Sequence, residues 1–314
     1  MDRDEKADPA AVRLACIRGL AWGLEHALEN DEFIDEYPEE DFENNLVRPL
    51  LFACGAGLLG NWLDELLEEY MKKVESSAAL TANCFGPLLL ADIPFELGQL
   101  RDLRVTSIDR SNRRGFYEPD EPALYVTAVG PGGSVVIDVS CLDYLTPIQP
   151  TQAEGMRADR TTRAGNKSAE QDGEQTMFDL LDAATLCDRA HDAGSTTGTA
   201  AATLIYVYWE PLDAGFSPLF AHHRREIERF AGQFAEGPVR FEAIGCFALW
   251  DAWATSDDPR LRAHAAQLRA RYEVPAWAWE GVEWIDGRLG TANWMMDLIE
   301  EVDGPVTAES NRRA

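Results

Sequence analysis

A histidine and a glutamate stand one helical turn apart at His222 and Glu226, in a stretch whose apolar residues recur at helical spacing. Side chains four residues apart share one face of a helix, and imidazole nitrogens and carboxylate oxygens both bind divalent metals. A metal site needs further ligands, and no third one is evident in the sequence. The neighbouring His223 falls on the apolar face of the same helix. The sequence therefore does not predict a metal site at this pair.

Signatures of several common enzyme classes are missing from the sequence. It contains no GxSxG serine-hydrolase motif, no GxxxxGK[ST] phosphate-binding loop and no GxGxxG after a predicted strand. The cysteines are scattered through apolar stretches, which argues against a zinc knuckle or a CxxC redox pair. We expect buried free thiols, as is usual in a reducing cytoplasm, at Cys16, Cys54, Cys84, Cys141, Cys187 and Cys246.

The chain is strongly acidic, with 55 Asp and Glu against 28 Lys and Arg and a net charge of −27. Its lysines are Lys6, Lys72, Lys73 and Lys167, so the predicted strand region between them has none. Three explanations stay open: a carboxylate coat suited to a high-salt cytoplasm, an acidic binding face that mimics nucleic acid, and drift in an arginine-rich genome. Each argues against loose, non-specific DNA binding at low salt.

Hydropathy gives a prediction about location. No apolar run reaches the roughly 18 residues that a membrane helix needs. The first residues are charged and lead into an amphipathic stretch, unlike a secretory signal. We therefore expect a soluble cytoplasmic protein with no membrane partner.

The elements that must position any site follow from residue periodicity. Apolar residues at helical spacing predict helices over 9–28, 46–51, 62–74, 78–90, 177–193, 216–234, 247–254 and 259–272. Alternating or continuous apolar runs predict strands over 104–108, 123–129, 134–139, 203–209 and 239–244. The turn Gly130-Pro131-Gly132-Gly133 predicts a hairpin between the second and third of these strands. Strands interleaved with helices predict an α/β fold with a mixed central sheet flanked by helices.

Composition also suggests how the chain is divided. We expect an N-terminal helical extension over 1–75, an α/β core over 76–275 and a C-terminal appendage over 276–314. Residues 151–175 are polar, with almost nothing to bury, and predict a mobile loop within the core. Residues 29–43 form a densely acidic strip, which is interpreted as a solvated loop in preference to a partner-binding strip.

The order and spacing of several blocks carry a resemblance to a known family. The blocks are Ser76–Leu88, Phe95-Glu96-Leu97, Val136–Leu145, Leu180–Ala184 and the strand end Thr203–Pro211 with its YWEP sequence. Together they resemble a group of uncharacterised prokaryotic restriction-endonuclease-like proteins of the PD-(D/E)XK nuclease superfamily. The resemblance runs from about residue 76 to about residue 254, and it implies a restriction-endonuclease-like fold.

The resemblance also implies site residues. In that superfamily an acid on one hairpin strand and an acid-x-Lys on the next hold one or two Mg²⁺ ions, which polarise a phosphodiester and activate water. Glu96 matches an early glutamate, Glu121 is the carboxylate nearest to the first-strand position, and Asp138 matches the acid of the second strand. The implied catalytic residues are thus Glu96, Glu121 and Asp138, with Glu121 and Asp138 as Mg²⁺ ligands.

Two positions depart from the family pattern. Tyr125 stands where the first-strand acid belongs, and Ser140 stands where the lysine belongs. Only a distant lysine or arginine could supply the missing charge, and arginine is a different donor with a fixed fork. Asp138 is equally well interpreted as a capping or turn carboxylate at a strand end.

Three hypotheses follow. The leading one is a nuclease-fold protein with a degenerate active site that acts as a DNA-related or defence-system component, binding DNA or another protein of such a system. The second is an active, atypical Mg²⁺-dependent DNA endonuclease using Glu96, Glu121 and Asp138. The third is an acidic protein-interaction module unrelated to nucleases, acting through the 29–43 strip or the tryptophan-rich tail.

Overall fold

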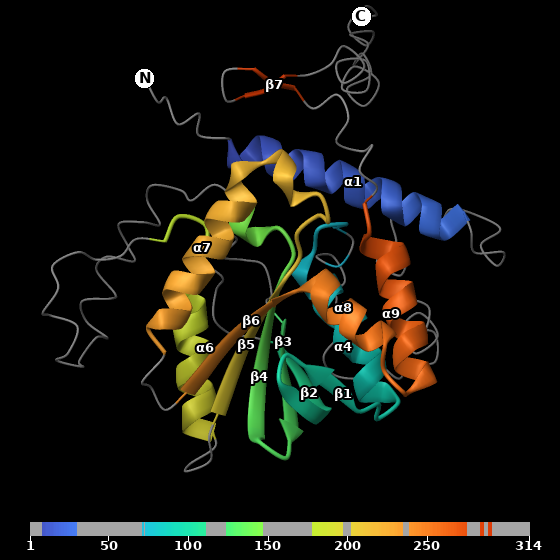
Figure 1. Cartoon of the computed structure of the whole chain (residues 1–314), viewed down its shortest axis with the longest axis vertical. Coiled ribbons are helices and arrows are strands. Elements are labelled where there is room, and N and C mark those ends of the chain that lie inside the picture. Colours follow the sequence, from blue (N-terminus) through green and yellow to red (C-terminus); the bar gives the residue numbers. More distant parts are fainter. Residues whose placement is uncertain are drawn as a thin grey trace, which may run out of the picture.

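The computed structural model describes residues 8–29, 71, 73–110, 124–146, 178–196, 202–234, 239–274, 283–285 and 288–290. These residues form a six-stranded mixed sheet with helices on both faces, together with a separate two-stranded hairpin (Figure 1). The α/β class and the mixed sheet flanked by helices, predicted from periodicity, are confirmed. The expected helix over 46–51 and the 151–175 loop lie outside the described residues, as do all of the 29–43 strip except Glu29 and all of the 62–74 helix except Met71, Lys73 and Val74.

The strands lie in the sheet in chain order, from β1 to β6. β1 to β4 are antiparallel neighbours, whereas β4, β5 and β6 are parallel and are joined through helices α6 and α7. The strands are β1 Phe95–Leu97, β2 Leu100–Arg110, β3 Leu124–Gly130, β4 Gly133–Ser140, β5 Ala202–Tyr208 and β6 Val239–Gly245, and the separate hairpin is β7 Glu283–Ile285 with β8 Arg288–Gly290.

The helices form two layers and a crossing element. α6 and α7 cover one face of the sheet, α4, α8 and α9 cover the other, and α1 lies across the end at which β4, β5 and β6 finish (Figure 1). They are α1 Pro9–Glu29, α4 Ser77–Leu90, α6 Ala183–Thr196, α7 Pro218–Gly232, α8 Cys246–Ala254 and α9 Pro259–Tyr272, with short 3₁₀ turns η3 Asp143–Leu145 and η4 Ala214–Phe216.

The sheet separates two apolar clusters. Val136, Leu204 and Phe241 lie in the cluster under α6 and α7, whereas Ile137 and Val207 lie in the larger one shared with α4, α8 and α9. Successive strand residues point to opposite faces, so a strand that is covered on both sides must be apolar throughout. β5 meets this requirement, since six of its seven residues are buried. The continuous run TLIYVYW is therefore explained by its central position.

Element ends follow the capping chemistry of the sequence. Ser76 caps α4, since its side chain accepts a hydrogen bond from the backbone N–H of Ala79 at 3.1 Å. Ser217 caps α7 in the same manner, and this helix starts at Pro218, two residues later than predicted. The helix expected from residue 177 begins instead at Ala183, because Asp182 accepts from the backbone N–H of Thr185 at 3.0 Å and so caps it. The short strand β1 was not predicted.

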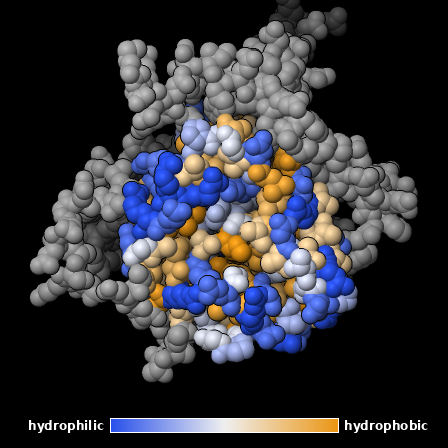
Figure 2. Space-filling model, viewed as in Figure 1, coloured by the Kyte–Doolittle hydropathy of each residue, from blue (hydrophilic) through white to orange (hydrophobic). Residues whose placement is uncertain are grey.

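Cysteine burial is confirmed in part. Cys16, Cys84, Cys141 and Cys246 are buried free thiols, whereas Cys187 on α6 is exposed and departs from the expectation, and Cys54 lies outside the described residues. None of the helices in the described part of the chain is both long and apolar enough to cross a membrane. In the view of Figure 2, hydrophilic side chains gather over α7 and apolar ones are visible towards the centre. The expected division into extension, core and appendage stays a prediction.

Candidate functional site

The β3–β4 hairpin sets the two positions singled out by sequence directly opposite each other. Tyr125 pairs with Asp138, so their side chains lie on the same face of the sheet. The row of paired residues that crosses the sheet at this point continues from Tyr125 to Asp109 on β2 and from Asp138 to Tyr206 on β5. This row faces α6 and α7, because Tyr125 and Tyr206 both belong to the apolar cluster beneath those helices.

Arg189 of α6 fills the space above this pair. Its Nε donates a hydrogen bond to Asp138 Oδ1 at 3.2 Å, and its guanidinium carbon lies 4.4 Å from the centre of the Tyr125 ring. The side chains of Arg189 and Asp138 are only 5% and 15% exposed. Asp138, Arg189 and Tyr125 therefore form a compact trio of anion, cation and aromatic face, which we call the hairpin trio.

The charge state of Asp138 reflects two opposing influences. Burial raises the pKa of this carboxyl above its usual range, Arg189 lowers it through its charge and its hydrogen bond, and Asp182 raises it further. Arg189 thus stabilises a carboxylate that burial would otherwise drive towards the neutral acid. No local pattern could have predicted this pair, because 51 residues separate its members.

Ser140, at the position where the resemblance would place a lysine, belongs to a hydrogen-bonded group at the end of β4. Its Oγ donates to Asp143 Oδ2 at 3.4 Å, and the Oγ of Ser77 donates to the same oxygen at 2.5 Å. The backbone N–H of Cys141 in turn donates to Ser77 Oγ at 2.7 Å. The serine, a neutral side chain, therefore helps to join α4 to β4 and supplies no cation to Asp138.

Glu96 lies apart from the hairpin trio. It sits on β1, is 51% exposed and forms an ion pair with Arg101. Phe95, the residue before Glu96, pairs with Leu103 on β2. Leu103 stands six residues before Asp109, which is the β2 member of the row that contains Asp138. At roughly 3.3 Å per residue this separates Glu96 from that row by about 20 Å. The structure does not bring Glu96 and Asp138 together, and Glu121 lies outside the described residues.

The hairpin trio does not fit the Mg²⁺ that the resemblance implies. Mg²⁺ takes octahedral oxygen ligands, keeps several waters and needs room for them. Asp138 offers one oxygen to Arg189, and the guanidinium closes the space between that oxygen and the Tyr125 ring. A second cation beside Asp138 would also be repelled by Arg189. Asp138, Arg189 and Tyr125 as arranged here therefore leave no room for a hydrated Mg²⁺ ion.

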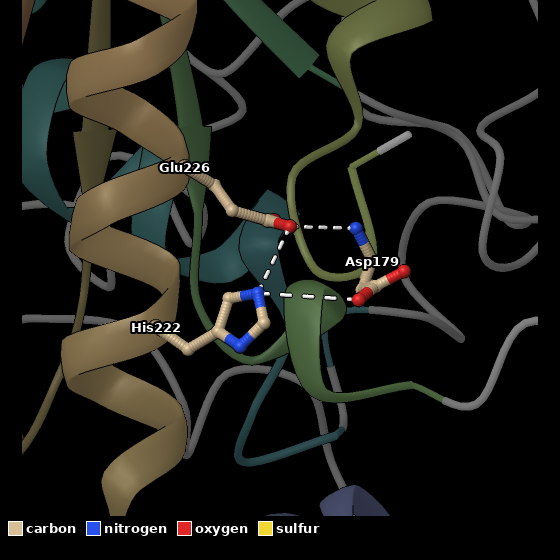
Figure 3. A group of neighbouring side chains, drawn as sticks. All are labelled: Asp179, His222 and Glu226. Atoms are coloured by element: carbon tan, nitrogen blue, oxygen red, sulfur yellow. Dashed lines mark hydrogen bonds and ion pairs between the residues drawn. The ribbon is translucent and has the colours of Figure 1, made fainter. Parts of the chain in front are cut away.

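A second group of side chains comes together between α7 and the segment that leads into α6 (Figure 3). His222 Nε2 lies 3.2 Å from Glu226 Oε1 and 4.0 Å from Asp179 Oδ2. The sequence showed no third partner for His222 and Glu226, and Asp179 supplies one, which corrects that expectation. Asp179 was missed because it stands over 40 residues earlier, in a non-helical segment that only the tertiary fold brings to α7.

Glu226 is the most buried member of this group and anchors the segment before α6. Its Oε1 accepts from the backbone N–H of Asp179 at 2.7 Å, and its Oε2 accepts from those of Leu180 at 2.9 Å and Leu181 at 2.8 Å. Its side chain is 2% exposed. Hydrogen bonds from backbone N–H groups to a carboxylate are charge-assisted and strong. Glu226 therefore positions Asp179 beside His222.

His223 follows the apolar interpretation of the sequence. It is buried, its ring stacks on Tyr144 at 3.9 Å between centroids, and its Nε2 lies 3.3 Å from the Tyr206 hydroxyl. Burial and the nearby Arg224 lower the pKa of His223 to about 3, so it is neutral in the folded protein near pH 7. His223 is thus a core residue, and His222 is the member of the pair that faces a polar group.

Comparisons with known proteins add no relative. Protein families, curated proteins and solved structures each give no match to this chain.

Proposed function

We propose that this chain is a restriction-endonuclease-like protein whose active site is degenerate, and that it acts as a DNA-related or defence-system component by binding rather than by cutting. The observation that carries the proposal is the contact of Arg189 with Asp138 at 3.2 Å. It follows from the resemblance that Asp138 occupies the metal-ligand position of the second hairpin strand. A guanidinium now compensates the charge that Mg²⁺ would compensate in a cutting enzyme.

Two further contacts support the loss of cleavage. Tyr125 pairs with Asp138 in the position of the first-strand acid, and it offers Arg189 an aromatic face in place of a second carboxylate. Ser140 uses its hydroxyl to hydrogen-bond Asp143. Without a second acid and a lysine at these positions, a phosphodiester at the hairpin would lack the charges that stabilise its transition state.

Plasmid cleavage tests the proposal. Supercoiled DNA is incubated with the purified full chain and Mg²⁺ or Mn²⁺, at low and at high salt because the chain carries a large negative charge. We expect no nicking or linearisation above the level of a protein-free control. Cleavage that disappears in Asp138→Ala, and persists in the exposed-acid control Asp213→Ala, would overturn the proposal.

The position of Arg189 also favours the second hypothesis, an active atypical Mg²⁺-dependent endonuclease. That hypothesis needs a basic nitrogen close to Asp138, and Arg189 Nε at 3.2 Å meets the requirement. It also needs carboxylates that converge on Asp138, and Glu96 does not do so. The plasmid experiment separates the two, since only the active enzyme loses cleavage in Asp138→Ala.

The third hypothesis, an acidic interaction module, depends on a different part of the chain. Its acidic strip at 29–43 lies outside the described residues apart from Glu29, and of the tryptophan-rich tail beyond Trp277 only β7 and β8 are described. Pull-down of partners before and after deletion of residues 29–43 tests it, and unchanged partner binding would reject the strip.

A further inference from the structure

We propose that Asp179, His222 and Glu226 form a binding site for one divalent transition-metal ion such as Zn²⁺. The three side chains come from two separate parts of the chain and point towards one another (Figure 3). One ligand atom from each lies within 4.8 Å of the others. The site is separate from the hairpin trio, so its existence does not depend on the function proposed above.

The spacing of the donor atoms suits a tetrahedral ion. Zn²⁺ bonds to nitrogen and oxygen at about 2.0–2.1 Å, which places neighbouring ligand atoms about 3.3 Å apart in a tetrahedron. The Nε2 of His222 and the Oε1 of Glu226 are already 3.2 Å apart. The Oδ2 of Asp179 is 4.0 Å from Nε2, and its side chain is 61% exposed, so a small rotation closes the remaining gap.

The site is held in place by its surroundings. Glu226 cannot turn away, because three backbone N–H groups from Asp179, Leu180 and Leu181 hold its buried carboxylate. Such hydrogen bonds orient metal ligands in known sites. His222 stands one turn before Glu226 on α7 and is 40% exposed, so an ion can approach from solvent. One ligand is therefore fixed and two are accessible.

The donor set selects the class of ion. One imidazole nitrogen with two carboxylates favours Zn²⁺, Mn²⁺ or Fe²⁺ over Mg²⁺ and Ca²⁺, which prefer oxygen alone. Binding through Nε2 requires the imidazole proton on Nδ1, which points away from the two carboxylates (Figure 3). Arg229 Nη2 approaches Glu226 Oε1 at 3.5 Å, and its guanidinium also rests over the Phe178 ring. The ion would replace the weaker contact of Arg229 with the carboxylate.

A bound ion would have a structural consequence. It would link α7 to the segment 178–182, which leads into α6, the helix that carries Arg189. Because an ion that binds only the folded chain stabilises it by mass action, Zn²⁺ should raise the midpoint of thermal unfolding.

Calorimetric titration of the full chain with Zn²⁺, after removal of metals by a chelator and dialysis, tests the site. The variants are His222→Gln, which removes the imidazole, and Asp179→Asn, which removes an exposed carboxylate. Glu228→Gln is the matched control, since it removes an exposed acid from the same helix. A thermal-unfolding scan of each protein with and without Zn²⁺ provides a second readout.

We expect one Zn²⁺ per chain for the unaltered protein and for Glu228→Gln. Loss of a ligand should weaken binding at least about tenfold in His222→Gln and in Asp179→Asn, because even the partners of metal ligands contribute about 10–100-fold. The thermal shift should fall in the same two variants. Absence of one-to-one binding, or equal affinity in all four proteins, would overturn the proposal.

Discussion

Replacing Arg189 with methionine tests the central contact of the hairpin trio. Methionine is unbranched and of similar length, so it keeps an apolar chain over Tyr125 while removing the guanidinium that bonds to Asp138 at 3.2 Å. Removing one partner of a buried ion pair costs about 3–5 kcal/mol of unfolding free energy. Because Asp138 keeps 15% exposure and can take up a proton, we expect the lower end, about 3 kcal/mol near pH 8.

The loss should depend on pH in a defined direction. Burial already raises the pKa of Asp138 above its unfolded value, and removal of Arg189 raises it further. A carboxyl whose pKa is higher in the folded state than in the unfolded state binds a proton preferentially in the folded state. Protonation therefore stabilises the folded state at low pH, and this stabilisation is lost as pH rises. The variant should therefore lose less stability near pH 5 than near pH 8, where the folded protein must hold an unpaired carboxylate.

Urea unfolding followed by tryptophan fluorescence measures these values, since Trp209, Trp250 and Trp253 are fully buried. Asp138→Asn and the double variant complete a cycle. The double variant should lose less than the sum of the single variants, with a coupling free energy of about 2 kcal/mol, because neither member then remains as an unpaired charge. The ion pair as described would be refuted by three results together: Arg189→Met loses less than about 1 kcal/mol of unfolding free energy, its stability depends on pH as in the unaltered protein, and the cycle shows no coupling between Arg189 and Asp138.

Three other predictions concern stability. Glu226→Gln should lower the free energy of unfolding, measured in urea, by about 3 kcal/mol, because charge-assisted hydrogen bonds to a buried carboxylate are lost. Unchanged hydrogen-exchange rates of the backbone amides of Leu180 and Leu181 would contradict this prediction. Ser77→Ala should cost about 1–2 kcal/mol in the same assay, since the backbone N–H of Cys141 loses its acceptor. Burial lowers the pKa of His264 to about 4 in the folded protein. As pH drops below about 6.5, the unfolded chain therefore takes up a proton at His264 that the folded chain does not, and stability falls. His264 should account for about 2 kcal/mol of the loss at about pH 5, and urea midpoints of His264→Gln across this range should fall less steeply.

Local patterns in the sequence determined most of the elements. The apolar run at 203–209, the turn at 130–133 and the helical spacing over 78–90 each act through near neighbours, and the structure contains the corresponding strand, hairpin and helix. The apolar side of His223 was equally evident, because helical periodicity alone assigns it to the core. The mixed α/β sheet followed from the alternation of these elements.

Ends and edges of elements depended on more distant contacts. Periodicity extends the α6 helix back to residue 177, but Glu226 of α7 binds the backbone N–H groups of 179–181 and keeps them outside the helix. β1 has only three residues, too few for a period, and it forms because β2 supplies its hydrogen-bonding partner. Neither partner can be identified from the local residues.

The side-chain groups were decided by the tertiary structure. The sequence determined that Asp138 stands opposite Tyr125, since hairpin register follows from the turn between them. Only the fold brought Arg189 to Asp138, placed Asp179 beside His222 and separated Glu96 from the hairpin. Charge pairing and metal ligation act over a few ångströms in space, whereas these residues are tens of positions apart in the chain, and the packing of α6 and α7 on the sheet sets the distances between them.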